Sequence, residues 1–229
     1  MQEFSEAEQA IMQLQREPTG LLRVSSPIEF GQLFLGGVVG EFMRCYPAIQ
    51  VEVELTTRAV DPVEEGVDVV IHLGRPQDSS LVARRLMTSP RQLYASPDYI
   101  KRCGMPAEAS ELTHHRCIHA LADGARKWRF DQPAISVPIS PVLVVNNITF
   151  AREAALAGVG IINVPAFIAE SCVEEGTLVR VLEQAELPSG ELYALYPSRR
   201  FQAMKVKAFI DFVVERLQLR SSSYIEVEG

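Results

Sequence analysis

Apolar and polar residues follow two different periods along the first part of the chain, and the changes of period separate strands from helices. Residues 49–55 (IQVEVEL) alternate strictly, which is typical of a strand with one buried and one wet face, as at the edge of a sheet. Residues 67–74 (VDVVIHLG) are apolar on both faces, as a central parallel strand should be. With a strand at 21–26, a helix at 31–45 and a short helix around 62–65, the order predicts right-handed crossovers and a parallel sheet.

Strands and helices also alternate in the middle of the chain, and one strand and one amphipathic helix follow at its end. Strands are expected at 116–120, 127–130, 135–145, 160–165, 178–182 and 191–197, and helices at 97–103, 148–157, 165–175 and around 206–217. The pattern predicts an α/β protein of two lobes joined by two crossing strands. Lobe I takes residues 20–95 and 197–220, and lobe II takes 96–196.

The two ends of the chain have patterns of their own. Phe4, Ala7, Ile11 and Leu14 form one narrow apolar seam along an expected helix over residues 1–16, which suits a partner helix. Pro and Gly break this helix before residue 21. Residues 221–229 (SSSYIEVEG) are expected to form a loose tail.

Composition narrows the class of protein. The 229 residues are 47% apolar and 22% charged, which excludes disordered, collagen-like and rod-like chains. The net charge of −7 argues against DNA binding by this chain alone. The longest uncharged stretch, residues 132–151, contains three prolines and two asparagines, so no membrane span is expected. The acidic N-terminus is unlike a secretory signal, which predicts a cytoplasmic protein with reduced thiols.

Motifs for catalysis are missing from the sequence, and no cofactor is expected. It has no GxGxxG, GxxxxGK[ST], GxSxG or HExxH pattern, so we expect no enzyme. The run HHRCIH (114–119) places His115, Cys117 and His119 on one face of a strand, where zinc or redox chemistry is conceivable. A second Cys/His pair is not evident, so we expect no metal and interpret Cys117 as a small buried side chain.

Ser, Thr and Asn recur where a strand ends and a helix begins, in VSSPIEFG, LTTRAVDP, VIHLG, YASPDYI and VNNITFAREA. In open parallel sheets, ligands bind beyond the carboxyl ends of strands, where helix N-termini offer free N–H groups. Ordinary helix capping uses the same residue types and is the simpler interpretation of each segment alone. Together, the five segments favour a small-molecule cleft.

The order of several segments resembles a known family. GLLRVSSPIEFGQLFLGGVVGEFMRCYPAIQVEVEL, VDPVEEGVDVVIHLG, DSSLVARRL, YASPDYI, AREAALAGVGIINVP and LYALYPSRRFQAMKVKAFIDFVVERL are similar to the effector-binding domain of LysR-type transcriptional regulators, over about residues 20–219. The resemblance implies two Rossmann-like lobes of the periplasmic-binding-protein type II architecture with an inducer between them. It also implies that residues 1–19 end a linker helix, and that a DNA-binding winged helix-turn-helix is missing before Phe4.

The resemblance also implies where an effector would be contacted. Carried over by position, the contacts are Ser26, Pro27, Thr56, Thr57, His72 and Leu73 in lobe I, and His119, Ala120, Asn147, Ile148 and Thr149 in lobe II. Two positions depart from the family pattern: His72 stands where arginine is common, and Thr57 where aspartate is frequent. An imidazole cannot form the two parallel hydrogen bonds that a guanidinium forms with a carboxylate. The identity of a ligand in the family therefore cannot be carried over to this chain.

These observations lead to a functional hypothesis with alternatives. We expect a regulatory domain that senses a small effector, expected to be a carboxylate, and that forms a homodimer (a tetramer in the full-length protein). This domain is expected to reach DNA only through the missing N-terminal domain, and to make no contact with a membrane. The dimer is expected to pair the helix at 31–45 with the helix at 148–158 of a second copy, through Phe34, Leu35 or Val38. The alternatives are a redox or metal-sensing regulatory domain and a cytoplasmic solute-binding protein.

Overall fold

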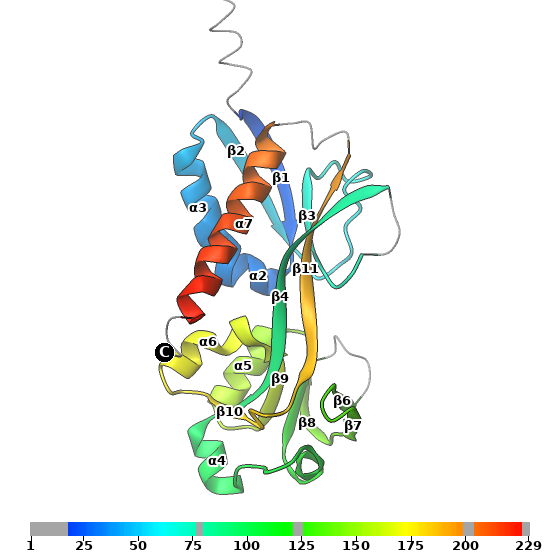
Figure 1. Cartoon of the computed structure of the whole chain (residues 1–229), viewed down its shortest axis with the longest axis vertical. Coiled ribbons are helices and arrows are strands. Elements are labelled where there is room, and N and C mark those ends of the chain that lie inside the picture. Colours follow the sequence, from blue (N-terminus) through cyan, green and yellow to red (C-terminus); the bar gives the residue numbers. More distant parts are fainter. Residues whose placement is uncertain (1–17, 77–79, 121–125, 199–203, 226–229) are drawn as a thin grey trace, which may run out of the picture. The chain divides into compact units, whose positions relative to one another are not determined.

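The computed structural model describes residues 18–76, 80–120, 126–198 and 204–225, with side chains up to Arg220 (Figure 1). The chain divides into two compact units: unit 1 holds residues 1–87 and 191–229, and unit 2 holds residues 88–190. Both changes of unit fall inside long strands, β4 (Leu81–Ala95) and β11 (Leu187–Pro197). The sequence-based boundaries, after residues 95 and 196, lie further along both strands. The helix expected over 1–16 lies outside the described residues.

Unit 1 contains the parallel strands predicted from the first part of the chain. β1 (Gly20–Ser26) lies between β2 (Ile49–Leu55) and β3 (Val69–Leu73) and is parallel to both. β11 pairs with the other side of β3 in antiparallel orientation, and β2 ends the sheet as predicted. Residues 62–65 form a turn and not the expected short helix, because the Asp61 carboxylate accepts hydrogen bonds from the N–H groups of Val63 and Glu64.

One continuous helical segment follows β1, and it contains a wide turn. It runs through α2 (Ile28–Phe30), a π-helical stretch η1 (Gly31–Leu35) and α3 (Gly36–Cys45), with the Gly36 N–H bonded to the Gly31 carbonyl five residues back. Gly31 is required there, since a Cβ atom would lie 2.2 Å from Cδ2 of Leu55. The helix expected at 31–45 therefore exists but starts earlier and is not uniformly α-helical.

The core of unit 1 lies between this helical segment, the sheet and the last helix, α7 (Met204–Ile225). Phe42 meets Phe209 edge-on at 5.3 Å between ring centroids. Leu35 and Val38 are buried in this core, so the expectation that they form a dimer surface is wrong. α7 also continues through Ile225, which contradicts a loose tail beginning at residue 221.

Strand β2 is less covered than its alternation predicts. Ile49 is buried, but Val53 and Leu55 are 40% and 38% exposed, although they belong to the apolar face. The predicted buried face is thus realised only at the beginning of the strand.

Asp68 anchors α7 to the sheet of unit 1. Its side chain is 4% exposed and accepts hydrogen bonds from Lys205 Nζ at 2.9 Å and from the Arg23 N–H at 3.0 Å. Lys205 Nζ also donates to the Leu21 carbonyl. The buried carboxylate is therefore fully provided with partners from within the protein.

Unit 2 has a sheet of its own order. β5 (Cys117–Ala120) lies between β9 (Ile161–Pro165) and β8 (Pro141–Val145) and is parallel to both, while β4 is antiparallel to β9. β10 (Val179–Val181) pairs with β4, and β6 (Lys127–Phe130) pairs with β7 (Ile135–Pro138) in a separate sheet. These strands confirm the ones predicted for the region, except that the single strand expected at 135–145 is divided into β7 and β8, which belong to different sheets.

Helices and a second core layer complete unit 2 (Figure 1). α5 (Ile148–Leu156) contacts β5, β8 and β9, and α6 (Ala166–Glu174) contacts β9 and α5. A buried cluster joins the sheet to α4 (Pro97–Cys103), the 3-10 helix η2 (Ala109–His114) and the β6–β7 pair. In the part of the chain that the structure describes, no helix is long and apolar enough to cross a membrane.

Candidate functional site

In unit 2, the expected ligand contacts gather where β5 and β8 end. Ala120 at the end of β5 lies opposite Val145 at the end of β8, and α5 begins three residues later. Asn147 caps α5, because its Oδ1 accepts a hydrogen bond from the Phe150 N–H at 2.7 Å. The helix-capping interpretation of this segment is therefore confirmed. Because β8 pairs with β5 in parallel and α5 follows β8, the start of α5 also lies beside the end of β5.

Two polar atoms in this region have no partner. His119 is 2% exposed and its Nε2 makes no hydrogen bond, and the Oγ1 atom of Thr149 is also buried without one. Over the described residues, these are the two buried side-chain nitrogen or oxygen atoms left in this condition. A buried polar atom without a partner costs about 1–3 kcal/mol, so each is a place where a ligand hydrogen bond would lower the free energy.

The first turn of α5 adds a favourable electrostatic field. This nine-residue helix has no acidic residue in its first turn, so no side-chain charge there opposes the positive end of the helix dipole. Threonine can donate or accept a hydrogen bond, and an imidazole Nε2 can do either according to its tautomer. The region can thus hold a ligand oxygen, including one from an anion. Ala120 and Ile148 are half-buried beside these groups in sequence.

In unit 1, the expected contacts lie at the ends of β1 and β2. The Thr56 N–H donates to the Ser26 carbonyl at 3.0 Å, which holds the two strand ends together. Ser26 is buried and its hydroxyl donates to the Pro27 carbonyl at 3.2 Å. Pro27, not a serine, occupies the N-cap of α2, so the interpretation of the serines as helix caps is wrong there. Thr56 Oγ1 accepts from the Arg58 N–H at 3.2 Å, and Thr57 is exposed.

His72 and Leu73 end strand β3. His72 pairs with Tyr193 of β11 and is half-buried, while Leu73 is 49% exposed. Burial lowers the pKa of His72 from its ordinary value of 6.5. A histidine with the ordinary pKa would become protonated between about pH 7 and 6, and its positive charge would strengthen anion binding. The lowered pKa moves that protonation to a more acidic range.

The histidine-rich run has a structural arrangement of its own. His115 Nδ1 lies 3.1 Å from the Tyr99 hydroxyl, which also accepts a hydrogen bond from the Arg116 N–H at 2.9 Å. Cys117 is fully buried, and burial raises the pKa of its thiol to about 12, which keeps the unreactive thiol form. Within the described segments, no three His, Cys, Asp or Glu side chains are arranged to hold a metal ion. The geometry gives the metal and redox alternatives no support at Cys117.

Comparison with known families gives one match that spans most of the chain. Residues 15–218 match the model described as the LysR substrate binding domain. An HTH-type transcriptional regulator of Xanthomonas campestris pv. campestris (strain 8004) is 33% identical over 229 residues. The alignment covers 94% of this chain but 64% of that relative, so the chain spans less than two thirds of the relative's length.

Solved structures agree with this match. The regulatory domain of CrgA, a LysR-type transcriptional regulator from Neisseria meningitidis, has a TM-score of 0.80 and 28% identity, covering 87% of this chain and 100% of that domain. A longer structure of CrgA has a TM-score of 0.82 and 27% identity, covering 94% of this chain and 74% of that protein. The similarity extends over both units, since the covered share exceeds either unit alone.

Proposed function

Because this chain belongs to the LysR family of transcriptional regulators, we propose that it binds a small carboxylate effector at the His119 and Thr149 region and forms a homodimer. The family match and the CrgA structures support a regulatory domain as the general function. The relatives are transcriptional regulators and not enzymes. The effector's chemistry and the residues that contact it are our proposal.

The observation that carries the effector site is the pair of unpartnered atoms, His119 Nε2 and Thr149 Oγ1. A carboxylate offers two oxygens, each able to accept hydrogen bonds from such groups. The positive end of the α5 dipole favours an anion by about 0.3–2 kcal/mol. Asn147 adds a neutral amide at the N-cap, and within unit 1 we propose Ser26 and Thr56 as effector contacts.

Isothermal titration with a panel of small aromatic and aliphatic acids tests the effector site. Asn147→Asp keeps a capping oxygen but adds a negative charge, so the affinity for an acid should fall strongly. Ser26→Ala deletes one hydroxyl and should weaken binding by about 1 kcal/mol. Ser171→Ala, at an exposed serine of α6 outside the proposed site, serves as a control that should leave affinity unchanged. A confirmed ligand whose affinity ignores both site variants would show that the site lies elsewhere.

The proposed homodimer rests on exposed apolar side chains on two edge strands and the helices beside them. Val53 on β2 and Met43 on α3 are 40% and 42% exposed, and Val144 on β8 and Phe150 on α5 are 39% and 57% exposed. We propose that a second copy of the chain covers these side chains. β2 and β8 are also the two ends of the main sheet, where backbone groups are left unpaired.

Light scattering coupled to gel filtration tests the homodimer. Phe150→Glu should convert a dimer at micromolar concentration into a monomer, because it would bury a charge in the interface. Val63→Glu is the control, since Val63 is 62% exposed but lies in the turn after β2 and on none of these elements. A monomeric parent chain would contradict the proposal.

DNA binding is proposed only for a protein that also carries the family's N-terminal DNA-binding domain. The chain's net charge of −7 gives it little attraction for phosphates. We therefore expect weak binding of duplex DNA at physiological salt in an electrophoretic shift assay. A sequence-specific shift at nanomolar protein would contradict this expectation.

A further inference from the structure

Unit 2 contains a second candidate ligand site, a cavity of about 530 Å³. Three segments line it: residues 105–110, which lead into η2, residues 133 and 135 at the start of β7, and residues 180 and 182–185 around the end of β10. None of the proposed effector contacts is among its lining residues. Its volume falls within the range of about 300–1,000 Å³ that is typical of small-molecule sites.

The walls of this cavity are mostly apolar and remain accessible. Met105 and Ile135 line it and are 49% and 41% exposed, although both are large apolar side chains. Ala109 and Leu182 on the same walls join the buried core of unit 2. A ligand with an apolar body would remove this exposed surface from water.

Leu182 stands out for its backbone. Its φ is +53°, and among the described residues it is the one non-glycine with a positive φ. Leucine avoids this left-handed region because its Cβ crowds the backbone, and such residues cluster at ligand sites. Leu182 follows β10 directly, so the strained residue forms part of the cavity wall.

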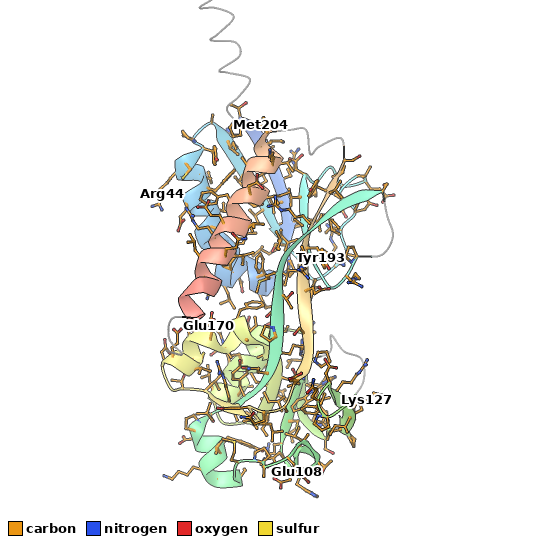
Figure 2. The ribbon with its side chains drawn as sticks, viewed as in Figure 1. Arg44, Glu108, Lys127, Glu170, Tyr193 and Met204 are labelled. Atoms are coloured by element: carbon orange, nitrogen blue, oxygen red, sulfur yellow. The ribbon has the colours of Figure 1, made fainter. Side chains whose placement is uncertain are left out.

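The charges at the cavity are predominantly negative. Glu108 and Glu183 line it and are exposed; Glu108, labelled in Figure 2, directly precedes η2. Behind the wall, Glu111 accepts a hydrogen bond from the N–H of Ala107 at 2.9 Å. The lining also contains one guanidinium, that of Arg180, so two carboxylates face one positive group. Burial raises the pKa of the Tyr94 hydroxyl, and Arg180, which also interacts with the Tyr94 side chain, lowers it.

We propose that this cavity binds a small amphipathic amine, an organic cation with an apolar body of about one aromatic ring and a short alkyl chain. The apolar body lies against Met105, Ile135 and Leu182, and the ammonium group lies near Glu108 and Glu183. An anionic ligand of the same shape would meet two carboxylates and bind worse. The site therefore selects a charge opposite to that proposed for the effector.

Amide NMR titration of the whole chain with 4-phenylbutylamine tests the proposal. Saturable shifts should appear at Ala107, Ala109, Ile135 and Leu182. 4-Phenylbutan-1-ol, which has the same body without the charge, should bind about fivefold more weakly, and 4-phenylbutyrate more weakly still. Absence of shifts at these residues, or equal affinity for the amine and the acid, would overturn the proposal.

Two kinds of variant distinguish the contribution of the charged groups to binding from the contribution of the cavity itself. The pair Glu108→Gln and Glu183→Gln should weaken amine binding about fivefold and leave alcohol binding unchanged. The pair Glu174→Gln and Glu175→Gln, exposed in unit 2 but away from the lining residues, is the matched control. Ala107→Trp, at an exposed wall position, should abolish binding of both ligands.

These variants decide the proposal even if one of them fails to fold. Circular dichroism and the Tm establish whether Ala107→Trp is native. If it is not, the two glutamine pairs at exposed positions decide the matter. Equal weakening by the site pair and the control pair would show that the amine senses only the general charge of the protein and would overturn the assigned site.

Discussion

Asp68 in unit 1 and His119 in unit 2 are both polar and almost fully buried, 4% and 2% exposed, but they differ in their partners. The Asp68 carboxylate receives hydrogen bonds from Lys205 and from the backbone of Arg23. His119 Nε2 receives and donates none. A buried polar group with internal partners belongs to the folded scaffold, whereas one without partners is a cost that a bound ligand can remove.

The largest effect should follow from removing Asp68. Asp68→Ala leaves Lys205, which is 21% exposed, without its carboxylate, so the free energy of unfolding should fall by about 3 kcal/mol in urea denaturation. Glu52→Ala is the control: it removes an ion pair with Arg23 whose side chains are 60% and 51% exposed, and it should change stability by less than about 1 kcal/mol. Similar losses in the two variants would remove the distinction drawn for Asp68.

For His119 we expect the reverse result, a small change in stability and a large loss of effector affinity. His119→Leu removes no internal hydrogen bond of Nε2, so the unfolding free energy of the free protein should stay within about 1 kcal/mol of the parent. Affinity for the effector, measured by titration calorimetry, should fall about tenfold, since a hydrogen bond with the ligand is lost. A stability loss as large as that of Asp68→Ala would place His119 in the scaffold.

Replacing each of two threonines of unit 2 by valine tests the same difference between polar groups with and without internal partners. The Thr177 hydroxyl donates to the Cys172 carbonyl at 3.0 Å, whereas the Thr149 hydroxyl has no partner. Thr177→Val should therefore lower the unfolding free energy by about 1 kcal/mol, and Thr149→Val should change it by less than about 0.5 kcal/mol. Effector affinity should fall about fivefold in Thr149→Val alone. The reverse order of stabilities would contradict the assignment of Thr149 as a ligand contact.

The smallest predicted effect is a pH dependence of the free energy of unfolding, and it should have the same sign for a histidine in each unit. Burial lowers the pKa of His72 in unit 1 and of His115 in unit 2 below the ordinary 6.5. The unfolded chain therefore takes up these protons first, so the unfolding free energy should decrease as pH falls from about 7.5 until the folded-state pKa values are passed. His72→Gln and His115→Gln should each flatten this dependence in urea denaturation. His114→Gln, at an exposed position, removes only the last of the causes that lower the pKa of His115 and should flatten the dependence least.

The sequence predicted those parts of the fold that depend on local pattern. The strict alternation of residues 49–55 located β2 and its place at a sheet edge, and Asn147 marked the start of α5. It could not show that α7 covers Val38, because burial of that residue depends on contacts between helices far apart in sequence. β11 begins at Leu187, four residues earlier than the strand expected at 191–197. The sequence pattern missed this part of the strand because Pro188 and Gly190 are typical turn residues.

The candidate sites were accessible from sequence to different degrees. His119 and Thr149 were nominated by the resemblance to the LysR family, and Thr149 also lies in a segment where a strand ends and a helix begins. Their lack of partners depends on packing and could not be predicted from the sequence. The amine cavity was missed entirely. Its walls come from residues 105–110, 133–135 and 180–185, and no local pattern in any of these segments indicates that the others lie beside it.

The π turn of η1 has a consequence for how this helix can change during evolution. A π turn holds one residue more than an α-helical turn, and one residue corresponds to about 100° of rotation around a helix. The wide turn absorbs the extra residue, so deleting a single residue within Gly31–Leu35 would restore a regular α-helix and leave α3 facing the same way relative to α2. Val38 and Phe42 would stay in the core. A deletion later in α3, where no wide turn absorbs it, would instead rotate the residues that follow by about 100° and take their apolar side chains out of the core.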